Sequence, residues 1–201
     1  MGYLDKKVVD KADLGKNKHK IDYEKLYFNK MPLLRLAYDH SKVKLSHELE
    51  RFYQNEKLWL EDFALYMAIK AHNGNKSWIE WEKGFENSKT PKVEAFKQTH
   101  KDEIYFWVFT QYFFFKQYYA LKAVAADKGI SIIGDLPIYV AEDSADVWSN
   151  PKFFKLGKNF KPTCVAGCPP DAFSETGQLW GNPIYEDRKS TRLNSSHGII
   201  S

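Results

Sequence analysis

The run YFWVFTQYFFFKQYY, from Tyr105 to Tyr119, restricts the fold more than any other part of this sequence. Its apolar side chains occupy so many positions that a helix through it carries aromatic rings around most of its circumference. A helix of this kind needs other elements to cover it. We therefore predict a helix over about 102–128 that Gly129 ends and that is buried on most sides, in preference to a helix whose rings form a platform for a ligand.

Shorter helices are expected before this one. Asp22 is a favourable N-cap for an amphipathic helix, which Pro32 is expected to kink or split. A second short helix is expected over 46–53, where a serine provides the cap. The stretch WLEDFALYMAIKAHNG has apolar residues at helical spacing and a glycine at its end. A threonine followed by proline then predicts a helix over about 91–100.

The pattern changes at residue 130. The β-branched run in KGISIIGDLPIYVA predicts a buried strand over 130–134, and a long helix followed by such a strand is typical of an α/β fold. Asp135 lies directly after this strand, where a β/α barrel places its active site; a simple turn-capping role for Asp135 is an equally good interpretation. Apart from one helical turn within 143–148, the chain from there to Tyr185 is expected to be loop, and such long loops are usually functional.

The net charge of +4 gives little support for a nucleic-acid partner, because residues 187–201 carry +2 of it. Lysines are frequent within residues 6–20, but aspartates alternate with them, so we interpret this segment as a solvated face. A nucleic-acid-binding protein needs a basic face or stripe instead. The six histidines are scattered and are expected to be surface residues.

The two cysteines, Cys164 and Cys168, lie four residues apart. They are half of a metal site at most, because no second Cys/His pair follows at zinc spacing; free thiols in a reducing cytosol are the favoured interpretation. The sequence contains no Gly-rich phosphate loop, HExxH motif or nucleophile elbow. We therefore expect neither a metal nor a cofactor.

A membrane partner is not expected either. The N-terminal MGYLDKKVVD has no apolar core of a signal peptide. The longest apolar run, Ile104–Phe115, is interrupted by Thr110 and Gln111 and is too short to span a bilayer. The sequence is therefore interpreted as that of a soluble, cytoplasmic protein.

The loop from Gly167 to Tyr185 concentrates the candidate binding residues. It combines carboxylate and amide side chains with flat apolar surfaces: Asp171, Gln178, Asn182, Phe173, Trp180 and Tyr185. Sugars are recognised by this combination, because their hydroxyls need polar partners and the C–H faces of their rings stack on aromatic side chains. The prolines and glycines of the loop limit its conformational freedom, so less entropy is lost on binding.

Two long motifs make a family resemblance specific. GDLPIYVAEDSADVWSNPKFF and PPDAFSETGQLWGNPIY resemble the amylomaltase or 4-α-glucanotransferase family, also called disproportionating enzymes, and the resemblance spans about 22–185. It implies an α/β fold: a fragment of a (β/α)8 TIM barrel with a mainly helical insertion. Residues 1–129 would then be the mainly helical segment and insertion, and residues 130–186 a barrel strand with the active-site lid loop.

The resemblance also implies a function. The family transfers 1,4-α-glucan segments to glucose or maltooligosaccharide acceptors with retention, and it uses no cofactor. By resemblance, Asp135 lies at the sugar site, and the mobile loop that covers the donor sugars carries Asp171, Phe173, Gln178 and Trp180. Asn182 joins this set as a further polar group of the loop. Some members have tyrosine where this chain has Ala172, so a contact made by that ring is not expected here.

Retaining transfer requires a carboxylate nucleophile and a carboxylic acid on opposite sides of the scissile bond. In the family these residues follow the GQLWGNP loop, so no residue of this chain is assigned a catalytic role, and the 201-residue chain alone is expected to be inactive. Two alternatives remain open. One is a related α-glucan hydrolase, which admits water to the intermediate, and the other is a non-catalytic glucan-binding protein.

The segment DRKSTRLNSSH differs from all that precedes it. Its back-translation resembles one reading frame of a common sequencing adapter, so residues 187–201 are expected to be an artefact and not part of the native protein. A disordered polar terminus is the alternative.

Overall fold

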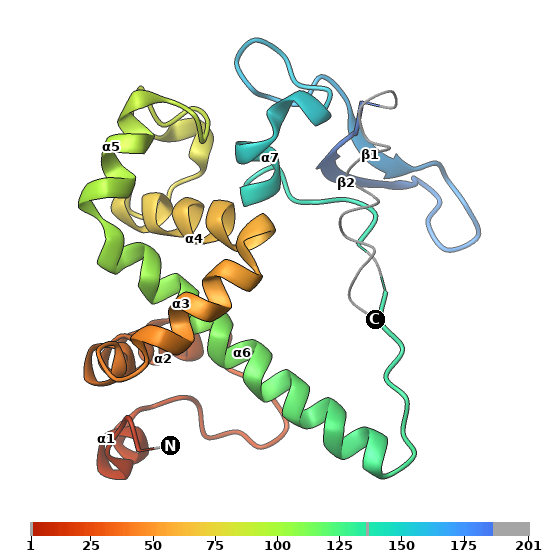
Figure 1. The fold of residues 1–201 in the computed structure, drawn as a ribbon. Coiled ribbons are helices and arrows are strands. Elements are labelled where there is room, and N and C mark those ends of the chain that lie inside the picture. Colours follow the sequence, from red (N-terminus) through yellow and green to blue (C-terminus); the bar gives the residue numbers. More distant parts are fainter. Residues whose placement is uncertain (1, 136, 187–201) are drawn as a thin grey trace. The chain divides into compact units, whose positions relative to one another are not determined.

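The structure is a computed structural model that describes residues 2–135 and 137–186 (Figure 1). The expectation for residues 187–201 lies outside the described residues. The chain divides into two compact units: Met1–Leu60 with Asp102–Ser131, and Glu61–Lys101 with Ile132–Ser201. Helix α4 (Lys57–His72) begins in the first unit and continues in the second.

The first unit is helical. It contains α1 (Lys6–Lys11), α2 (Tyr23–Ser41), α3 (Ser46–Asn55) and nearly all of α6 (Lys101–Asp127). Asp22 caps α2 as predicted, because its carboxylate accepts a hydrogen bond from the Lys25 amide at 3.1 Å. Pro32 lies inside α2 and does not split it.

The core of the first unit forms where α2 and α3 meet the first half of α6 (Figure 1). The Tyr38 ring of α2 packs edge-on against Phe106 and Phe109 of α6, at centroid distances of 5.8 and 5.4 Å. Leu49 of α3 belongs to the same buried cluster. The Tyr38 hydroxyl donates to the Asp102 carboxylate at 3.1 Å, so the polar end of this buried ring is satisfied.

Helix α6 forms where the sequence predicts a long helix, but it is not buried along its whole length. It ends at Asp127, and Gly129 adopts a φ of +70°, as expected for a glycine that ends a helix. Its second half is open: Phe114 is 58% exposed and Leu121 61% exposed. The prediction of burial on most sides is therefore correct only for the first half, since α2 and α3 do not cover the rest.

The second unit combines short helices with one small sheet. After α4 come the 3-10 turn η1 (Trp78–Glu80), α5 (Pro91–Thr99), α7 (Ala145–Ser149), the turn η2 (Pro151–Phe153), and the strands β1 (Val165–Cys168) and β2 (Gln178–Pro183). Thr90 caps α5 as predicted, with its hydroxyl accepting from the Val93 amide at 3.2 Å.

Trp148 of α7 lies at the centre of this unit. Its side chain is fully buried, and its indole N–H donates to the carbonyl oxygen of Phe85 at 2.8 Å. The rings of Tyr66 and Trp81 contact it at centroid distances of 5.7 and 5.9 Å. The aromatic cluster joins α4 to the chain that leads into the sheet.

The predicted strand over 130–134 is not formed. These residues belong to no ladder in the described part of the chain, and Ile133 is 95% exposed. A strand exists only through hydrogen bonds to neighbouring strands, and a parallel barrel strand needs them on both sides. The sheet that is formed, β1–β2, is antiparallel and was not predicted. The described residues by themselves are thus mainly helical, without the parallel sheet of an α/β fold.

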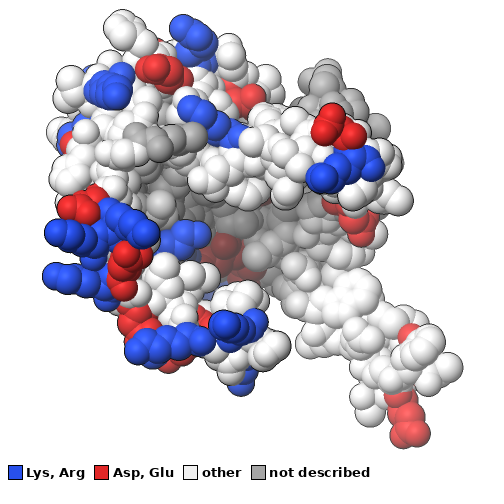
Figure 2. All heavy atoms as spheres, turned by 90° about the horizontal axis from the view of Figure 1, so that it is seen from below, with Lys and Arg blue, Asp and Glu red and all other residues white. Residues whose placement is uncertain are grey.

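Charged side chains of both signs are mixed on the face that Figure 2 shows. Ion pairs in the described residues include Lys25 with Asp13 at 2.6 Å and Lys92 with Glu82 at 2.7 Å. Among residues 2–135 and 137–186, no helix is both long enough and apolar enough to cross a membrane.

Candidate sugar-binding hairpin

Strands β1 and β2 present the predicted loop residues as a β-hairpin. Gly167 pairs with Leu179, and Cys168 pairs with Gln178. The hairpin closes at Gly177, whose φ is +72°. A Cβ atom on Gly177 would lie 2.5 Å from the carbonyl oxygen of Cys168, so only glycine fits between the strand ends.

The register of the hairpin changes once. Val165 pairs with Pro183, so two steps along β1 correspond to four steps along β2, and the additional β2 residues form a bulge. Gly181 lies in this bulge with a φ of +80°. Bulges alter the direction of side chains beside them, and here the bulge separates Trp180 from Asn182.

Asp171 shapes the tip of the hairpin. Its Oδ1 accepts hydrogen bonds from the amides of Phe173 and Ser174, both at 2.8 Å. These backbone donors stabilise the carboxylate and hold its pKa below the ordinary value. The sequence predicts Asp171 as a polar partner for a sugar. The structure shows that its Oδ1 is already used by the loop itself and that its Oδ2 accepts from the Cys168 thiol at 3.7 Å.

The aromatic residues of the hairpin are open to solvent. Phe173 is 96% exposed at the tip, and Trp180 is half exposed on β2. The indole N–H of Trp180 donates to the Gln178 side-chain oxygen at 2.9 Å, which fixes the two side chains beside one another. Flat rings next to an amide group form a surface of the kind that binds sugars.

Asn182 connects the hairpin to the motif segment PIYVAED, residues 137–143. Its side-chain N–H donates to the carbonyl oxygen of Val140 at 2.9 Å. Beside this bond, the rings of Tyr139 and Trp180 lie 6.2 Å apart at an angle of 53°. The structure therefore brings together three of the predicted residues, Gln178, Trp180 and Asn182, although Asn182 uses its amide within the protein.

Asp135 is not brought into this group. It is exposed, and within the described residues no hydrogen bond or ion pair links it to the hairpin. Tyr185, the remaining aromatic residue of the predicted loop, packs against Phe154 at a centroid distance of 4.8 Å and so supports the base of the hairpin.

Asp143 holds the motif segment in place, a role that sequence reasoning missed. Its carboxylate accepts from the Tyr66 hydroxyl at 2.5 Å, from the Trp78 amide at 3.2 Å and from the Lys70 ammonium group. The indole N–H of Trp78 also donates to the carbonyl oxygen of Glu142 at 2.8 Å. In the sequence, the one feature that marks Asp143 is its position directly before Ser144, the N-cap of α7, and this does not indicate the contacts with Tyr66, Lys70 and Trp78.

We expect the Asp143 contacts to weaken in acid. Burial alone would raise the pKa of Asp143, but the hydrogen bonds from Lys70, Tyr66 and Trp78 outweigh it, so the pKa lies below the ordinary value of 3.8. A carboxyl group whose pKa is lowered by folding stabilises the protein above its unfolded pKa, and this contribution is lost as the pH falls through the folded pKa.

The measurement compares melting temperatures of the wild-type protein and Asp143→Asn at pH 6 and near pH 3. Asparagine keeps an acceptor for Tyr66 and Trp78 but loses the charge that faces Lys70. The wild type should melt higher at pH 6, and the difference should shrink in acid. A difference that is the same at both pH values would contradict this account.

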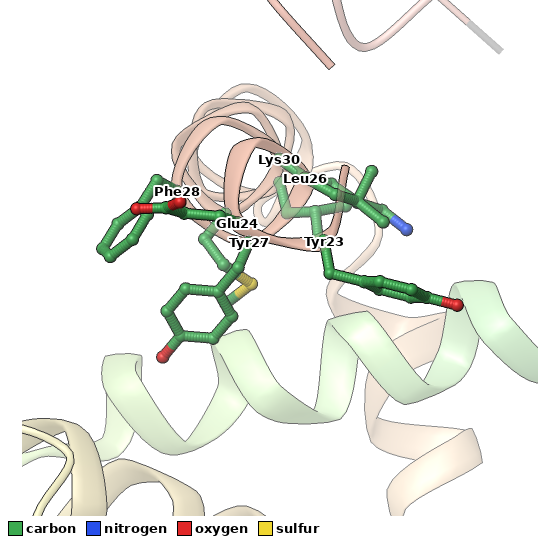
Figure 3. A pocket seen from close by; sticks show the side chains of 8 residues that line it. Tyr23, Glu24, Leu26, Tyr27, Phe28 and Lys30 are labelled. Atoms are coloured by element: carbon green, nitrogen blue, oxygen red, sulfur yellow. The ribbon is translucent and has the colours of Figure 1, made fainter. Parts of the chain in front are cut away.

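A second surface feature lies on α2. Figure 3 shows side chains of Tyr23, Tyr27 and Phe28 that line an open apolar groove of about 610 Å³. All three rings are more than half exposed.

In the described part of the chain, no cluster of three or more His, Cys, Asp or Glu residues is arranged to hold a metal ion.

Comparison with known proteins places this fold in a class. Over 96% of this chain and 39% of the neighbour, the structure resembles an amylomaltase from Streptococcus agalactiae solved in complex with acarbose, with a TM-score of 0.87 and 39% sequence identity. The described chain thus has the fold of a region of an amylomaltase.

Sequence comparison identifies the family. The 4-alpha-glucanotransferase family matches residues 2–194. Proteins named 4-alpha-glucanotransferase from Clostridium butyricum and Streptococcus pneumoniae are 46% and 45% identical over 91% and 92% of this chain. The chain belongs to the 4-alpha-glucanotransferase family. It spans 38% and 37% of the length of these two relatives.

Proposed function

We propose that the whole protein is a 4-α-glucanotransferase, which transfers 1,4-α-glucan segments to glucose or maltooligosaccharide acceptors. The observation that carries the proposal is an exposed aromatic and amide hairpin in a chain about 45% identical to proteins of that name. The structural neighbour binds acarbose, which supports an α-glucan or maltooligosaccharide as the substrate.

The substrate-binding residues of this proposal are those of the hairpin together with Asp135. Phe173 and Trp180 supply faces for the sugar rings, and the Gln178 amide supplies hydrogen bonds to hydroxyls. Asp171 and Asn182 are included because they lie on the same hairpin, although each also makes internal hydrogen bonds. Asp135 is included by resemblance alone, as the residue after a barrel strand.

The proposed architecture is a (β/α)8 barrel of which this chain forms a part. Residues 130–134 would become a strand once parallel neighbours flank them, and their exposed isoleucines support this, since they are apolar side chains without a cover here. Residues 1–129 would form the mainly helical segment and insertion, and 130–186 the strand and lid loop. Residues 187–201 are proposed to be non-native; long-read sequencing that recovers DRKSTRLNSSH in the genome would refute this.

The chemistry proposed for the whole protein follows from retention of the anomeric configuration of the transferred sugar. A carboxylate attacks the anomeric carbon while a carboxylic acid protonates the departing sugar oxygen, and a sugar hydroxyl then displaces the enzyme from the glycosyl intermediate. Water must be kept away from that intermediate if transfer is to exceed hydrolysis. The hairpin is proposed to provide this cover. No residue of this chain is proposed as nucleophile or acid, so the isolated chain is expected to be inactive.

A cytoplasmic location is part of the proposal. Cys164 and Cys168 are both free thiols in the structure, as suits a reducing compartment. Fractionation of the cells that make the protein would test the location.

The proposed activity is tested with the purified full-length protein and maltotriose. We expect glucose together with maltooligosaccharides longer than maltotriose. Glucose and maltose without longer products would favour the alternative of an α-glucan hydrolase. Binding of maltooligosaccharides without any new product would favour a non-catalytic glucan-binding protein.

A further inference from the structure

Trp180 lies on a strand that gives its ring little support. Among residues 2–135 and 137–186, strand β2 has only β1 as a hydrogen-bonded neighbour, and Gln178, Leu179 and Trp180 are all exposed. The bulge at Gly181 follows directly. An exposed ring that must stack on a sugar loses rotational freedom on binding unless the protein has already fixed it.

Two contacts fix the indole. One is the hydrogen bond from its N–H to the Gln178 side chain at 2.9 Å. The other is the ring of Tyr139, whose centroid lies 6.2 Å from that of Trp180 at 53°, within the range of favourable aromatic pairs. Tyr139 is partly buried, whereas half of Trp180 remains open to solvent.

Tyr139 is itself held through the residues that follow it in the chain. The next residue, Val140, accepts the hydrogen bond from Asn182 at 2.9 Å. Three residues further on, Asp143 is bound by α4 through Tyr66 and Lys70. Residues 139–143 therefore form a support that is anchored to the helical part of this unit and contacts β2 at Trp180 and Asn182.

We propose that Tyr139 is a positioning residue for sugar binding: its ring holds the indole of Trp180 in the orientation that stacks on a glucan ring. This inference rests on the proposed function, in which Trp180 contacts the sugar. Tyr139 acts through its ring, so its hydroxyl group is dispensable.

The test uses the full-length protein and steady-state kinetics on maltotriose. Tyr139→Phe keeps the ring and should leave KM within about twofold of the wild type. Tyr139→Ala should raise KM about three- to tenfold, the range that corresponds to losing one aromatic pair, with little change in kcat. If Tyr139→Ala does not fold, Tyr139→Leu replaces it, since leucine keeps apolar volume without a flat ring.

A double-mutant cycle with Trp180→Ala separates positioning from direct contact. If Tyr139 acts through the indole, Tyr139→Ala should change KM less than about twofold once Trp180 is alanine. An equally large effect in both backgrounds would overturn the inference, and so would a Tyr139→Phe variant as defective as Tyr139→Ala.

The cycle also distinguishes this inference from the proposed function. If Trp180→Ala raises KM but Tyr139→Ala acts independently, only the role of Tyr139 is wrong. If Trp180→Ala leaves KM unchanged, the proposed sugar contact of Trp180 is wrong, and the inference about Tyr139 is overturned with it.

Discussion

Replacing Trp148 by alanine is expected to destabilise the protein by about 3–5 kcal/mol, the usual cost of removing a large buried aromatic side chain. Trp148 is fully buried, its ring contacts Tyr66 and Trp81, and its indole N–H satisfies the carbonyl oxygen of Phe85. The substitution therefore leaves a cavity and also an unpaired buried acceptor.

The measurement is the apparent melting temperature of the full-length protein, with Phe173→Ala as the matched control. Phe173 is almost wholly exposed, so its removal should leave the melting temperature nearly unchanged. A Trp148→Ala protein that melts with the control would show that the aromatic cluster does not stabilise this unit.

Replacing Gly177 by alanine is expected to impair activity strongly. The residue combines a φ of +72° with a Cβ position only 2.5 Å from the Cys168 carbonyl oxygen, so the strand ends must move apart to admit a methyl group. That movement displaces the tip, which carries Asp171 and Phe173. Since a misplacement of about 1 Å can cost about 100-fold in rate, we expect kcat/KM on maltotriose to fall by about ten- to 100-fold.

Gly74→Ala is the control for Gly177→Ala. Gly74 also has a positive φ, of +66°, but a Cβ there meets nothing within 4 Å. It therefore shares the backbone strain without the steric conflict. Equal kcat/KM values for the two variants would contradict the idea that close packing of the strand ends positions the tip.

The helices could be predicted because their signals are local. The side chains of Asp22 and Thr90 each accept a hydrogen bond from an amide three residues further along the chain. Gly129 follows the end of α6 and adopts the positive φ that is typical of a glycine at this position. The incomplete burial of α6 could not be predicted in this way. It depends on which elements reach each part of the helix: α3 contacts it as far along as Phe115, and most residues beyond that point are exposed.

The strands, unlike the helices, could not be predicted from local signals. The β-branched residues at 130–134 predicted a strand, but a strand needs partners, and propensity does not provide them. Each of the strands β1 and β2 contains a glycine, β1 is followed by proline and β2 ends on one, so their composition resembles a loop. Their pairing depends on close approaches at Gly167 and Gly177.

The candidate site was predicted as a set of residue types, and the structure adds what each one contacts. Phe173 and Trp180 are open to solvent, as a sugar-stacking role requires. Asp171 and Asn182 instead bond to the backbone of the tip and of Val140. Tyr139 and Asp143 could not be selected from the sequence, because their roles depend on contacts with β2 and α4.

We propose that the whole protein transfers glucan segments to sugar acceptors. The most direct measurement incubates the full-length protein with maltotriose and ¹³C-labelled glucose and follows the label. We expect labelled maltooligosaccharides in which the α-configuration is retained. Their formation should be abolished when Phe173 and Trp180 are both replaced by alanine. Label that stays in free glucose while maltotriose is consumed would contradict transfer and show hydrolysis instead.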